Sequence, residues 1–199
     1  VKAIANLGRT EVGTYYERLN YAVGEAHEPG STFKLIAMIA ALEDKVIDEN
    51  TLIKTGDGEL TFYGKYKVRD SKKGGYGTIP ASKVLEVSSN TGIVKIIHDN
   101  YKTNPKKFVD RLYNMGINKP IGLPIKGEGI PKIPYPNDAD WDGLDLPWMA
   151  YGYGVAMTPL QTLAFYNAVA NNGELVKPRF IEKIGVIGER PHQEFGREI

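Results

Sequence analysis

The sequence contains no cysteine among its 199 residues. The absence of thiols excludes disulfide frameworks, thiolate zinc sites and cysteine nucleophiles, which leaves serine, threonine or carboxylate chemistry for an enzyme. Histidine is also scarce: His27, His98 and His192 are scattered and show no ligand spacing such as His-x-x-x-His. We therefore expect neither a metal site nor a cofactor.

A large excess of charge of either sign is absent as well. Lys and Arg total 25 against 24 for Asp and Glu, a net charge of +1, so the chain lacks the field that usually marks nucleic-acid binding. The longest apolar run, residues 35–42, is far shorter than the roughly 20 residues of a membrane span. No basic-then-apolar signal region opens the chain. The 199-residue chain is therefore expected to be soluble and to bind no nucleic acid.

The length and the 42% apolar content suit a globular chain with one substantial core, taken here as one partial domain over residues 1–199. Apolar residues on nearly every side predict a buried central helix over residues 31–44. Periodicity, capping residues and turn residues predict the other elements: helices over 79–87, 91–100 and 105–115 and after a capping box at 158–161, strands over 1–7 and 180–187, and hairpins within 51–69. Residues 120–147, rich in Pro, Gly and Asp, are interpreted as a loop that shapes a site.

Ser31 and Lys34 form the first pair with chemical potential. Three residues apart in the first turn of a helix, they lie on one face and within reach of a direct hydrogen bond. Burial lowers the pKa of a lysine, and the neutral amine then accepts the proton of a serine nucleophile. Alternatively, Ser31 only caps the helix, since a lone Ser-x-x-Lys occurs about once by chance in a chain of this size.

A second pair follows at the break between two predicted helices, in Ser88-Ser89-Asn90. There the Ser88 hydroxyl is placed to relay a proton between the nucleophile, the lysine and the leaving group. The Asn90 amide is placed to hold a substrate amide and to orient the lysine. Alternatively, this tripeptide is only another helix cap ahead of Thr91.

Together these residues resemble a known family. Five segments carry the resemblance: residues 28–34 (Glu-Pro-Gly-Ser-Thr-Phe-Lys), 88–90 (Ser-Ser-Asn), 152–154 (Gly-Tyr-Gly), 158–161 (Thr-Pro-Leu-Gln) and 170–173 (Ala-Asn-Asn-Gly). They resemble the transpeptidase domain of class B, monofunctional penicillin-binding proteins, for which Ser-x-x-Lys followed by a Ser-x-Asn element is a signature. The loop 127–129 (Gly-Glu-Gly) ahead of Trp141 resembles the division-type septal members most.

The resemblance implies an α+β fold like that of penicillin-binding proteins and serine β-lactamases, of which this chain supplies mainly the helical lobe and an incomplete sheet. It also implies catalytic roles for Ser31, Lys34, Ser88 and Asn90. The implied reaction is cross-linking of peptidoglycan: a D-alanyl-D-alanine peptide stem acylates Ser31, the last D-alanine leaves, and an amine of a neighbouring stem takes the acyl group. β-Lactam antibiotics are expected to acylate the same serine.

The family also carries a third element, Lys-Thr/Ser-Gly, on an edge strand. Lys54-Thr55-Gly56 matches its letters but lies between the first two elements, and the Asp57-Gly58 that follows predicts a turn, not a long edge strand. We interpret this tripeptide as a chance match. The resemblance places the true element downstream of residue 184, past the last residue here, so we expect this chain to lack part of its oxyanion hole. Loss of one oxyanion donor costs about two to three orders of magnitude in rate, so weak or no activity is expected.

By resemblance, the full protein is expected to work outside the cytoplasm, on the periplasmic face, anchored by an N-terminal membrane helix. Its expected partners are division and cell-wall synthesis proteins. Three alternatives stay open: a serine β-lactamase or β-lactam sensor domain, a D,D-carboxypeptidase, and a scaffold domain that has lost the chemistry. The nucleophile-and-base set argues against the scaffold, which has no need of it.

Overall fold

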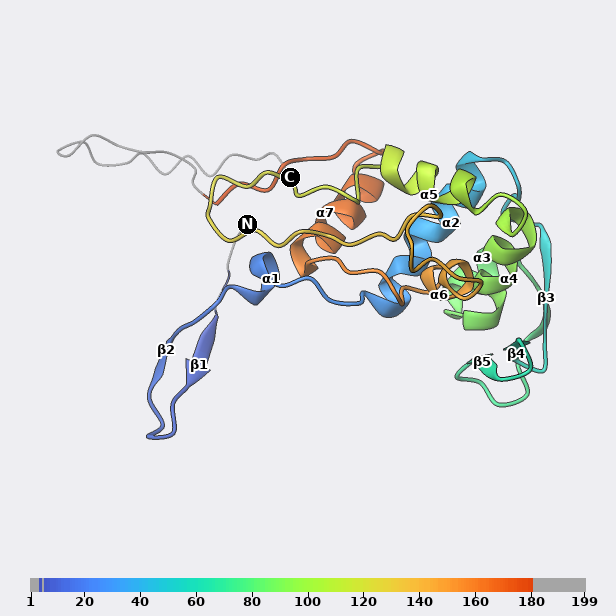
Figure 1. Ribbon diagram of the computed structural model, residues 1–199, viewed down its shortest axis with the longest axis horizontal. Helices are drawn as coiled ribbons and strands as arrows, with labels where there is room; N and C mark the ends of the chain where they lie inside the picture. The colour runs from blue at the N-terminus through green and yellow to red at the C-terminus, as the bar shows by residue number, and fades with distance from the viewer. Residues whose placement is uncertain (1–3, 5, 181–199) are drawn as a thin grey trace.

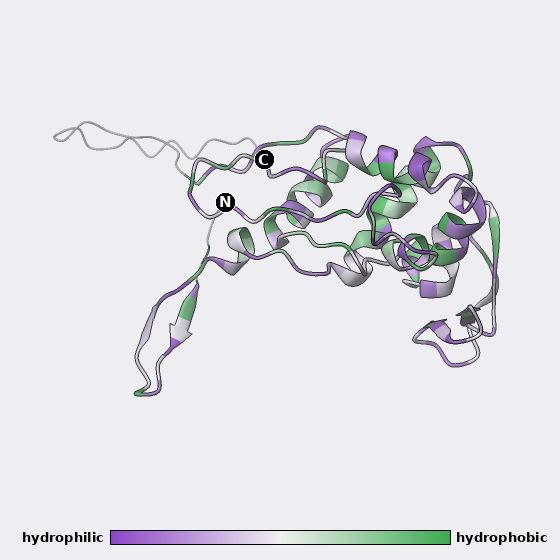
Figure 2. Cartoon of the chain, viewed as in Figure 1, coloured by the Kyte–Doolittle hydropathy of each residue, from purple (hydrophilic) through white to green (hydrophobic). Residues whose placement is uncertain are grey.

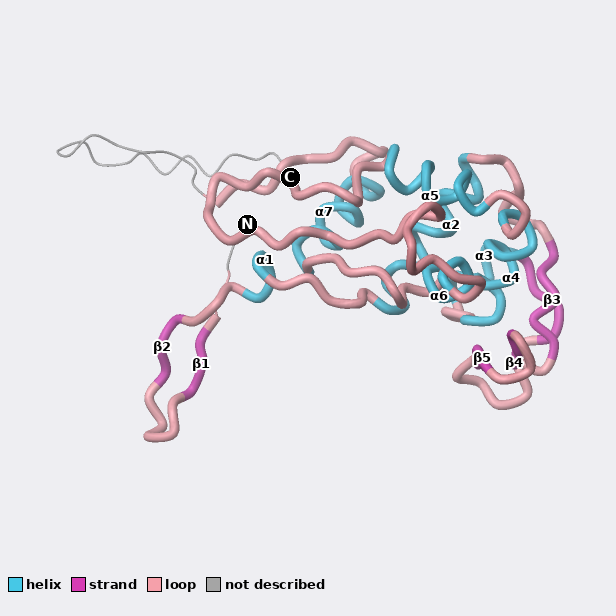
Figure 3. The backbone as a smooth tube through the Cα atoms, in the orientation of Figure 1, coloured by secondary structure: helices cyan, strands magenta, loops and turns pink. Residues whose placement is uncertain are grey.

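The computed structural model describes residue 4 and residues 6–180 of the chain. Helix exceeds strand, as predicted for an α+β chain (Figures 1 and 3). The helices are α1 (Tyr21–Gly24), the 3-10 turn η1 (Gly30–Thr32), α2 (Phe33–Glu43), α3 (Ala81–Glu86), α4 (Asn90–Tyr101), α5 (Pro105–Asn114), α6 (Asp145–Met149) and α7 (Pro159–Ala170). The strands are β1 (Leu7–Arg9), β2 (Tyr15–Glu17), β3 (Leu52–Gly56), β4 (Glu59–Phe62), β5 (Tyr66–Arg69) and β6 (Gly77–Pro80).

The described strands form three antiparallel pairs, β1–β2, β3–β6 and β4–β5. The β1–β2 hairpin extends away from the helices, whereas β3, β4 and β5 lie at the opposite end of the molecule (Figure 1). The predicted hairpins within residues 51–69 are confirmed in part, since β4 and β5 form a hairpin but β3 pairs with the later β6. The helices, not a continuous sheet, therefore organise the described part of the chain.

Helix α2 is the centre of the core, as its apolar sequence predicts. Phe33, Ile36, Ala37, Ala40 and Ala41 are fully buried, and α2 packs against α3, α4 and α5. Hydrophobic residues gather where these helices meet (Figure 2). Because few positions of α2 face water, its place is set by packing on several sides at once.

Helices α5 and α7 follow their predicted start signals. At α7, the Thr158 hydroxyl accepts from the Gln161 amide at 3.1 Å and the Gln161 side chain accepts from the Thr158 amide at 2.8 Å, which is the predicted capping box. Helix α5 starts at Pro105 and buries Phe108 and Leu112.

Within the described residues, 4 and 6–180, no helix is long and apolar enough to cross a membrane.

The predicted first strand is wrong in its bounds. It was placed over residues 1–7 with Gly8 as its end, but β1 runs through Gly8 to Arg9 because Gly8 pairs with Tyr16 of the unpredicted β2. Gly8 was interpreted as the end of the strand, but pairing with β2 continues through Gly8 to Arg9. The predicted strand 180–187 lies outside the described residues except for Phe180, which is not in a strand.

The end of α2 is fixed by one buried carboxylate. The Asp44 side chain is 4% exposed and accepts hydrogen bonds from the Tyr101 hydroxyl of α4 at 2.9 Å and from Nε of Arg111 of α5 at 2.8 Å. Burial and the nearby carboxylate raise the pKa of Tyr101, so the phenol keeps its proton and stays a donor. One side chain thus ties together three core helices.

Replacing Asp44 with alanine is expected to destabilise the fold by about 2–4 kcal/mol, because it leaves a buried tyrosine hydroxyl and an arginine without their acceptor. Urea unfolding at pH 7 checks this through the midpoint. Glu49→Ala, which removes an exposed carboxylate just beyond α2, is the control and should shift the midpoint little. Equal midpoints for the two variants would contradict the role given to Asp44.

Candidate active site

Ser31 lies in the 3-10 turn η1 and is exposed to solvent. The sequence placed it in the first turn of the α-helix, but α2 begins at Phe33, because positions 30–32 form the tighter turn. The position that caps α2 is Thr32, and no hydrogen bond of the Ser31 hydroxyl is recorded among the described residues. The alternative that Ser31 serves only as a helix cap is therefore not supported.

The Ser31 turn is held against the Gly152-Tyr153-Gly154 segment. The Gly30 amide donates to the Gly152 carbonyl at 3.0 Å, and the Gly154 amide donates to the Glu28 carboxylate at 2.9 Å. A Cβ at Gly152 would lie 2.1 Å from the Gly30 carbonyl oxygen, and its φ of +87° is one that glycine adopts without strain. Two segments of the resemblance, 126 residues apart, thus meet at the candidate nucleophile.

Lys34 is the buried centre of the site. Its side chain is on α2 and the residue is 1% exposed. Its Nζ donates to the Ser88 carbonyl at 2.6 Å, to Ser88 Oγ at 3.0 Å and to Asn90 Oδ1 at 2.5 Å. The predicted contact between the Lys34 position and the Ser88-Ser89-Asn90 element is therefore present.

The direct hydrogen bond expected between Ser31 and Lys34 is not recorded in the described part of the chain. The reason is that an ammonium has three protons, and the three acceptors on Ser88 and Asn90 take them all. A neutral amine keeps two protons for the Ser88 carbonyl and the Asn90 oxygen, which only accept. Its lone pair is then free for a hydroxyl, and Ser31 stands one helical turn away.

Burial lowers the pKa of Lys34 from 10.5 to about 8, and the negative charge of Asp70 opposes part of that shift. Around neutral pH a useful fraction of the amine is therefore unprotonated. A lysine with that pKa next to an exposed serine can take the serine proton and return it to a leaving group.

Ser88 has an unusual backbone. Its φ is +53°, in the left-handed region that non-glycine residues rarely adopt. The Ser88 amide bonds to the Leu85 carbonyl and the Ser89 amide to the Val84 carbonyl, which is the Schellman ending of α3, where glycine is the common residue. A strained non-glycine residue costs about 1–3 kcal/mol and is kept where surrounding contacts hold it, often at functional sites.

The helix-cap alternative for Ser88-Ser89-Asn90 is correct for one of the three residues. Ser89 is buried and its hydroxyl accepts from the Gly92 amide at 2.9 Å, which caps α4. The side chains of Ser88 and Asn90 bond to Lys34. Capping and site formation therefore occur together in one tripeptide.

Asp70, which directly follows β5, was not predicted as a site residue. Its carboxylate accepts from Ser89 and Thr91, and the carbonyl of its neighbour Arg69 accepts from Nδ2 of Asn90 at 2.7 Å. A single aspartate after a short strand has no spacing that marks it. Only the fold shows that it reaches the Ser88-to-Asn90 element.

The Lys54-Thr55-Gly56 tripeptide forms the end of strand β3, with a turn after it at Asp57 and Gly58. The turn was predicted, and the short strand lies within the residues predicted to form hairpins, although its partner is the later β6. Lys54 is exposed, and the buried Thr55 donates its hydroxyl to the Gly77 carbonyl of β6 at 3.0 Å. That hydroxyl is occupied within a strand pair, in keeping with its interpretation as a chance match.

The residues 120–147, predicted as a site-shaping loop, are irregular as far as α6. Glu128 organises the first part, since its carboxylate accepts from the backbone amides of Ile121, Gly122 and Leu123. The Gly129 amide bonds to the Val23 carbonyl at 2.8 Å, so the loop is fastened beside α1. Its contribution to a substrate site stays a prediction.

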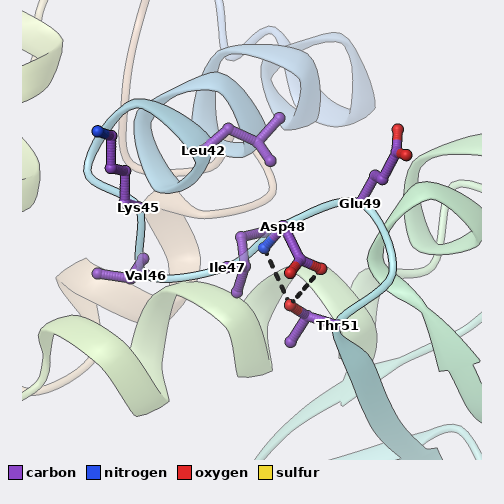
Figure 4. A pocket seen from close by; sticks show the side chains of 7 residues that line it. All are labelled: Leu42, Lys45, Val46, Ile47, Asp48, Glu49 and Thr51. Atoms are coloured by element: carbon purple, nitrogen blue, oxygen red, sulfur yellow. Dashed lines mark hydrogen bonds between the residues drawn. The ribbon is translucent and has the colours of Figure 1, made fainter.

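A surface hollow lies at the other end of α2, beyond Leu42 (Figure 4). It is lined by residues 45–49 and Thr51, and the Asp48 carboxylate there is engaged by the Thr51 hydroxyl at 2.9 Å. At a rise of about 1.5 Å per residue, α2 separates this hollow from Ser31 by roughly 16 Å. Neither Ser31 nor Lys34 lines it.

Residue 4 and residues 6–180 contain no group of three His, Asp or Glu side chains that could hold a metal ion.

Comparison with known proteins shows the family of the chain. A family model described as the penicillin binding protein transpeptidase domain matches residues 3–197. Peptidoglycan D,D-transpeptidase FtsI of Escherichia coli is 28% identical over 88% of this chain and 28% of its own length. Penicillin-binding protein PbpB of Mycobacterium tuberculosis is 29% identical over 82% of this chain and 23% of its own length. The chain thus spans about a quarter of the length of these relatives.

Solved structures give the same fold. The transpeptidase domain of penicillin-binding protein 3 from Burkholderia pseudomallei matches with a TM-score of 0.71 and 28% identity. The match covers 83% of this chain and 47% of that one. The predicted α+β transpeptidase-like fold is confirmed.

Replacing Ser88 by glycine and by alanine separates strain from chemistry. Both changes remove the hydroxyl, but only glycine adopts φ of +53° at no steric cost, so Ser88→Gly should be about 1 kcal/mol more stable than Ser88→Ala. Thermal unfolding of the two variants and the unchanged chain checks this. A Ser88→Gly variant no more stable than Ser88→Ala would show that this turn carries no strain.

Proposed function

This chain belongs to the penicillin binding protein transpeptidase domain family, and from that premise we propose that it carries the serine nucleophile of a peptidoglycan D,D-transpeptidase. The observation that supports this most is the buried Lys34 amine, bonded to Ser88 and Asn90 and one turn from the exposed Ser31. A base with a lowered pKa, a hydroxyl relay and a free nucleophile are what acyl transfer through serine requires.

In the proposed first step, Ser31 Oγ attacks the carbonyl carbon of the penultimate D-alanine of a peptide stem, and its proton passes to Nζ of Lys34. The C–N bond to the terminal D-alanine breaks, and the leaving amine takes that proton, with the Ser88 hydroxyl as relay. An ester to Ser31 remains. The amine of a neighbouring stem then attacks this ester, loses a proton and regenerates the serine hydroxyl.

Electrostatic stabilisation of the oxyanion is proposed to involve the Ser31 backbone N–H, at the start of the helical segment that continues into α2. Asn90 is positioned by the Arg69 carbonyl, so its amide is fixed near Lys34. We assign to Asn90 the orientation of the lysine and of a substrate amide. A β-lactam would enter by the same attack, with ring opening in place of D-alanine release.

The finer parts of the proposal rest on the family resemblance. They are a septal role, an association with division and cell-wall synthesis proteins, and action on the outer face of the cytoplasmic membrane by a protein anchored there. The similarity to a peptidoglycan D,D-transpeptidase and a penicillin-binding protein favours a transpeptidase over a β-lactamase or a sensor domain.

Incubation with benzylpenicillin tests the nucleophile. Intact-mass measurement should show one stable covalent adduct on the full-length protein and none on its Ser31→Ala variant. Thr32→Ala, which removes the adjacent hydroxyl, is the matched control and should keep the adduct. The same measurement on the 199-residue chain tests the expectation of weak or no acylation.

An adduct that decays within minutes would move the assignment to a β-lactamase. A folded full-length protein that forms no adduct would overturn the proposed chemistry and favour the scaffold alternative. Circular dichroism of each variant establishes that it is folded.

The pH dependence of acylation tests Lys34 as the base. Because the neutral amine is the active form and its pKa is about 8, the acylation rate should rise with pH, pass an inflection near pH 8 and level off above it. Lys34→Met should lower the plateau by about 10²–10⁴-fold and remove the inflection.

Lys45→Met, on the exposed side just beyond α2, is the control and should leave the profile unchanged. Stopped-flow acylation with a chromogenic cephalosporin gives the rates. A flat profile from pH 6.5 to 9.5 in the unchanged protein would rule out a base with this pKa.

A further inference from the structure

The Asp70 carboxylate, just after the β4–β5 hairpin, accepts several hydrogen bonds from the start of α4. Its Oδ1 accepts from the Thr91 amide at 2.9 Å, and its Oδ2 accepts from the Thr91 hydroxyl at 2.8 Å. The Ser89 hydroxyl lies 3.0 and 3.1 Å from the two oxygens. Both partners are buried, Ser89 at 1% and Thr91 at 0% exposure, so the carboxylate is the acceptor for donors that water does not reach.

These bonds fix the residues on both sides of Asn90. The Ser89 hydroxyl accepts from the Gly92 amide, so its single proton is left to donate to Asp70. The carbonyl of Arg69, the residue before Asp70, takes Nδ2 of Asn90. Because one end of the Asn90 amide is held there, its Oδ1 is the end that faces Lys34. Arg69 and Asp70 thus hold three consecutive residues.

Ser88 depends on the same anchor. Its left-handed backbone directs both its carbonyl and its hydroxyl to Nζ of Lys34. A strained turn persists only when the surrounding contacts over-determine it, and the next residue, Ser89, is tied to Asp70. Position also favours the anchor, since a negative carboxylate at the start of the 12-residue helix α4 interacts well with the helix dipole.

We propose that Asp70 is a positioning residue for the acyl transfer: through Ser89 and Thr91 it holds the strained Ser88 turn, and so presents Ser88 and Asn90 to Lys34. The proposal rests on the function proposed above and adds a residue outside the Ser31, Lys34, Ser88 and Asn90 set. Asp70 itself makes no recorded hydrogen bond to Lys34 among the described residues. Its negative charge also opposes part of the lowering of the Lys34 pKa. The positioning role is separate from that charge effect and is exerted through the geometry of the neighbouring element.

Asp70→Asn is the informative change. It keeps the size of the side chain but replaces one acceptor oxygen with an NH₂ group, which cannot accept from the Ser89 and Thr91 donors. In the full-length protein, the first-order acylation constant with a chromogenic cephalosporin should fall roughly 10–100-fold, as expected for small misplacements of catalytic groups. The dissociation constant of the non-covalent complex should change less than threefold.

The matched control is Glu59→Gln. It removes a carboxylate from the same hairpin, where Glu59 pairs with Lys67 and Arg69, but it touches neither Ser89 nor Thr91. Its acylation constant should equal that of the unchanged protein. Rates are referred to the folded fraction from circular dichroism, so a loss of stability alone does not lower them.

A mutant cycle separates positioning from a general effect of charge. If Asp70 acts through Thr91, then Asp70→Asn combined with Thr91→Val should slow acylation no more than about twofold beyond Asp70→Asn alone. Fully multiplicative effects, or an Asp70→Asn variant that acylates at the unchanged rate, would overturn the proposal. An unchanged protein that forms no Ser31 adduct would instead overturn the function on which the proposal rests.

Discussion

The burial of one amine is the constraint on which the rest of this structure depends. A lysine with its side chain inside a protein must have hydrogen-bond partners or lose its charge. Lys34 has hydrogen-bond partners, and burial also lowers its pKa. Its partners lie 54 and 56 residues away, so the helical pair α3–α4 must be packed against α2 before the amine is satisfied. The core and the site are therefore built by the same contacts, and α2 has a place in both.

Around this amine the two ends of α2 have different tasks. At its end the Asp44 carboxylate joins α4 and α5 and fixes where the helix lies. Before its beginning, the Gly152 segment and the Tyr166 hydroxyl, which donates to the Thr32 carbonyl at 3.0 Å, hold the turn that carries Ser31. Because Ser31 and Lys34 lie three positions apart in one continuous helical segment, their relative position is nearly fixed. The geometry that tertiary structure must supply is the approach of Ser88 and Asn90.

Sequence patterns predicted the parts of the molecule that local chemistry decides. The apolar run gave α2, the Thr158 capping box gave α7, and Pro105 gave the start of α5, each through interactions within about one helical turn. The four candidate site residues were predicted because a family pattern joined segments that are weak signals alone, and their roles stay a prediction. Strand β2 and the β3–β6 pairing were missed, since pairing depends on a partner distant in the chain. Asp70 was missed for the same reason, and the left-handed Ser88 because serine carries no mark of that conformation.

The attachment of the site to the β4–β5 hairpin bears on how the protein loses function. Two four-residue strands form a small unit at one end of the molecule, and such units open locally at a lower free energy than the core. When this hairpin separates from α4, the partners of Ser89, Asn90 and Thr91 leave together, while α2 keeps Ser31 and Lys34 in place. Warming should therefore produce molecules whose core is still folded but whose site can no longer be acylated. Acylation activity should be lost at a lower temperature than the one at which the core unfolds.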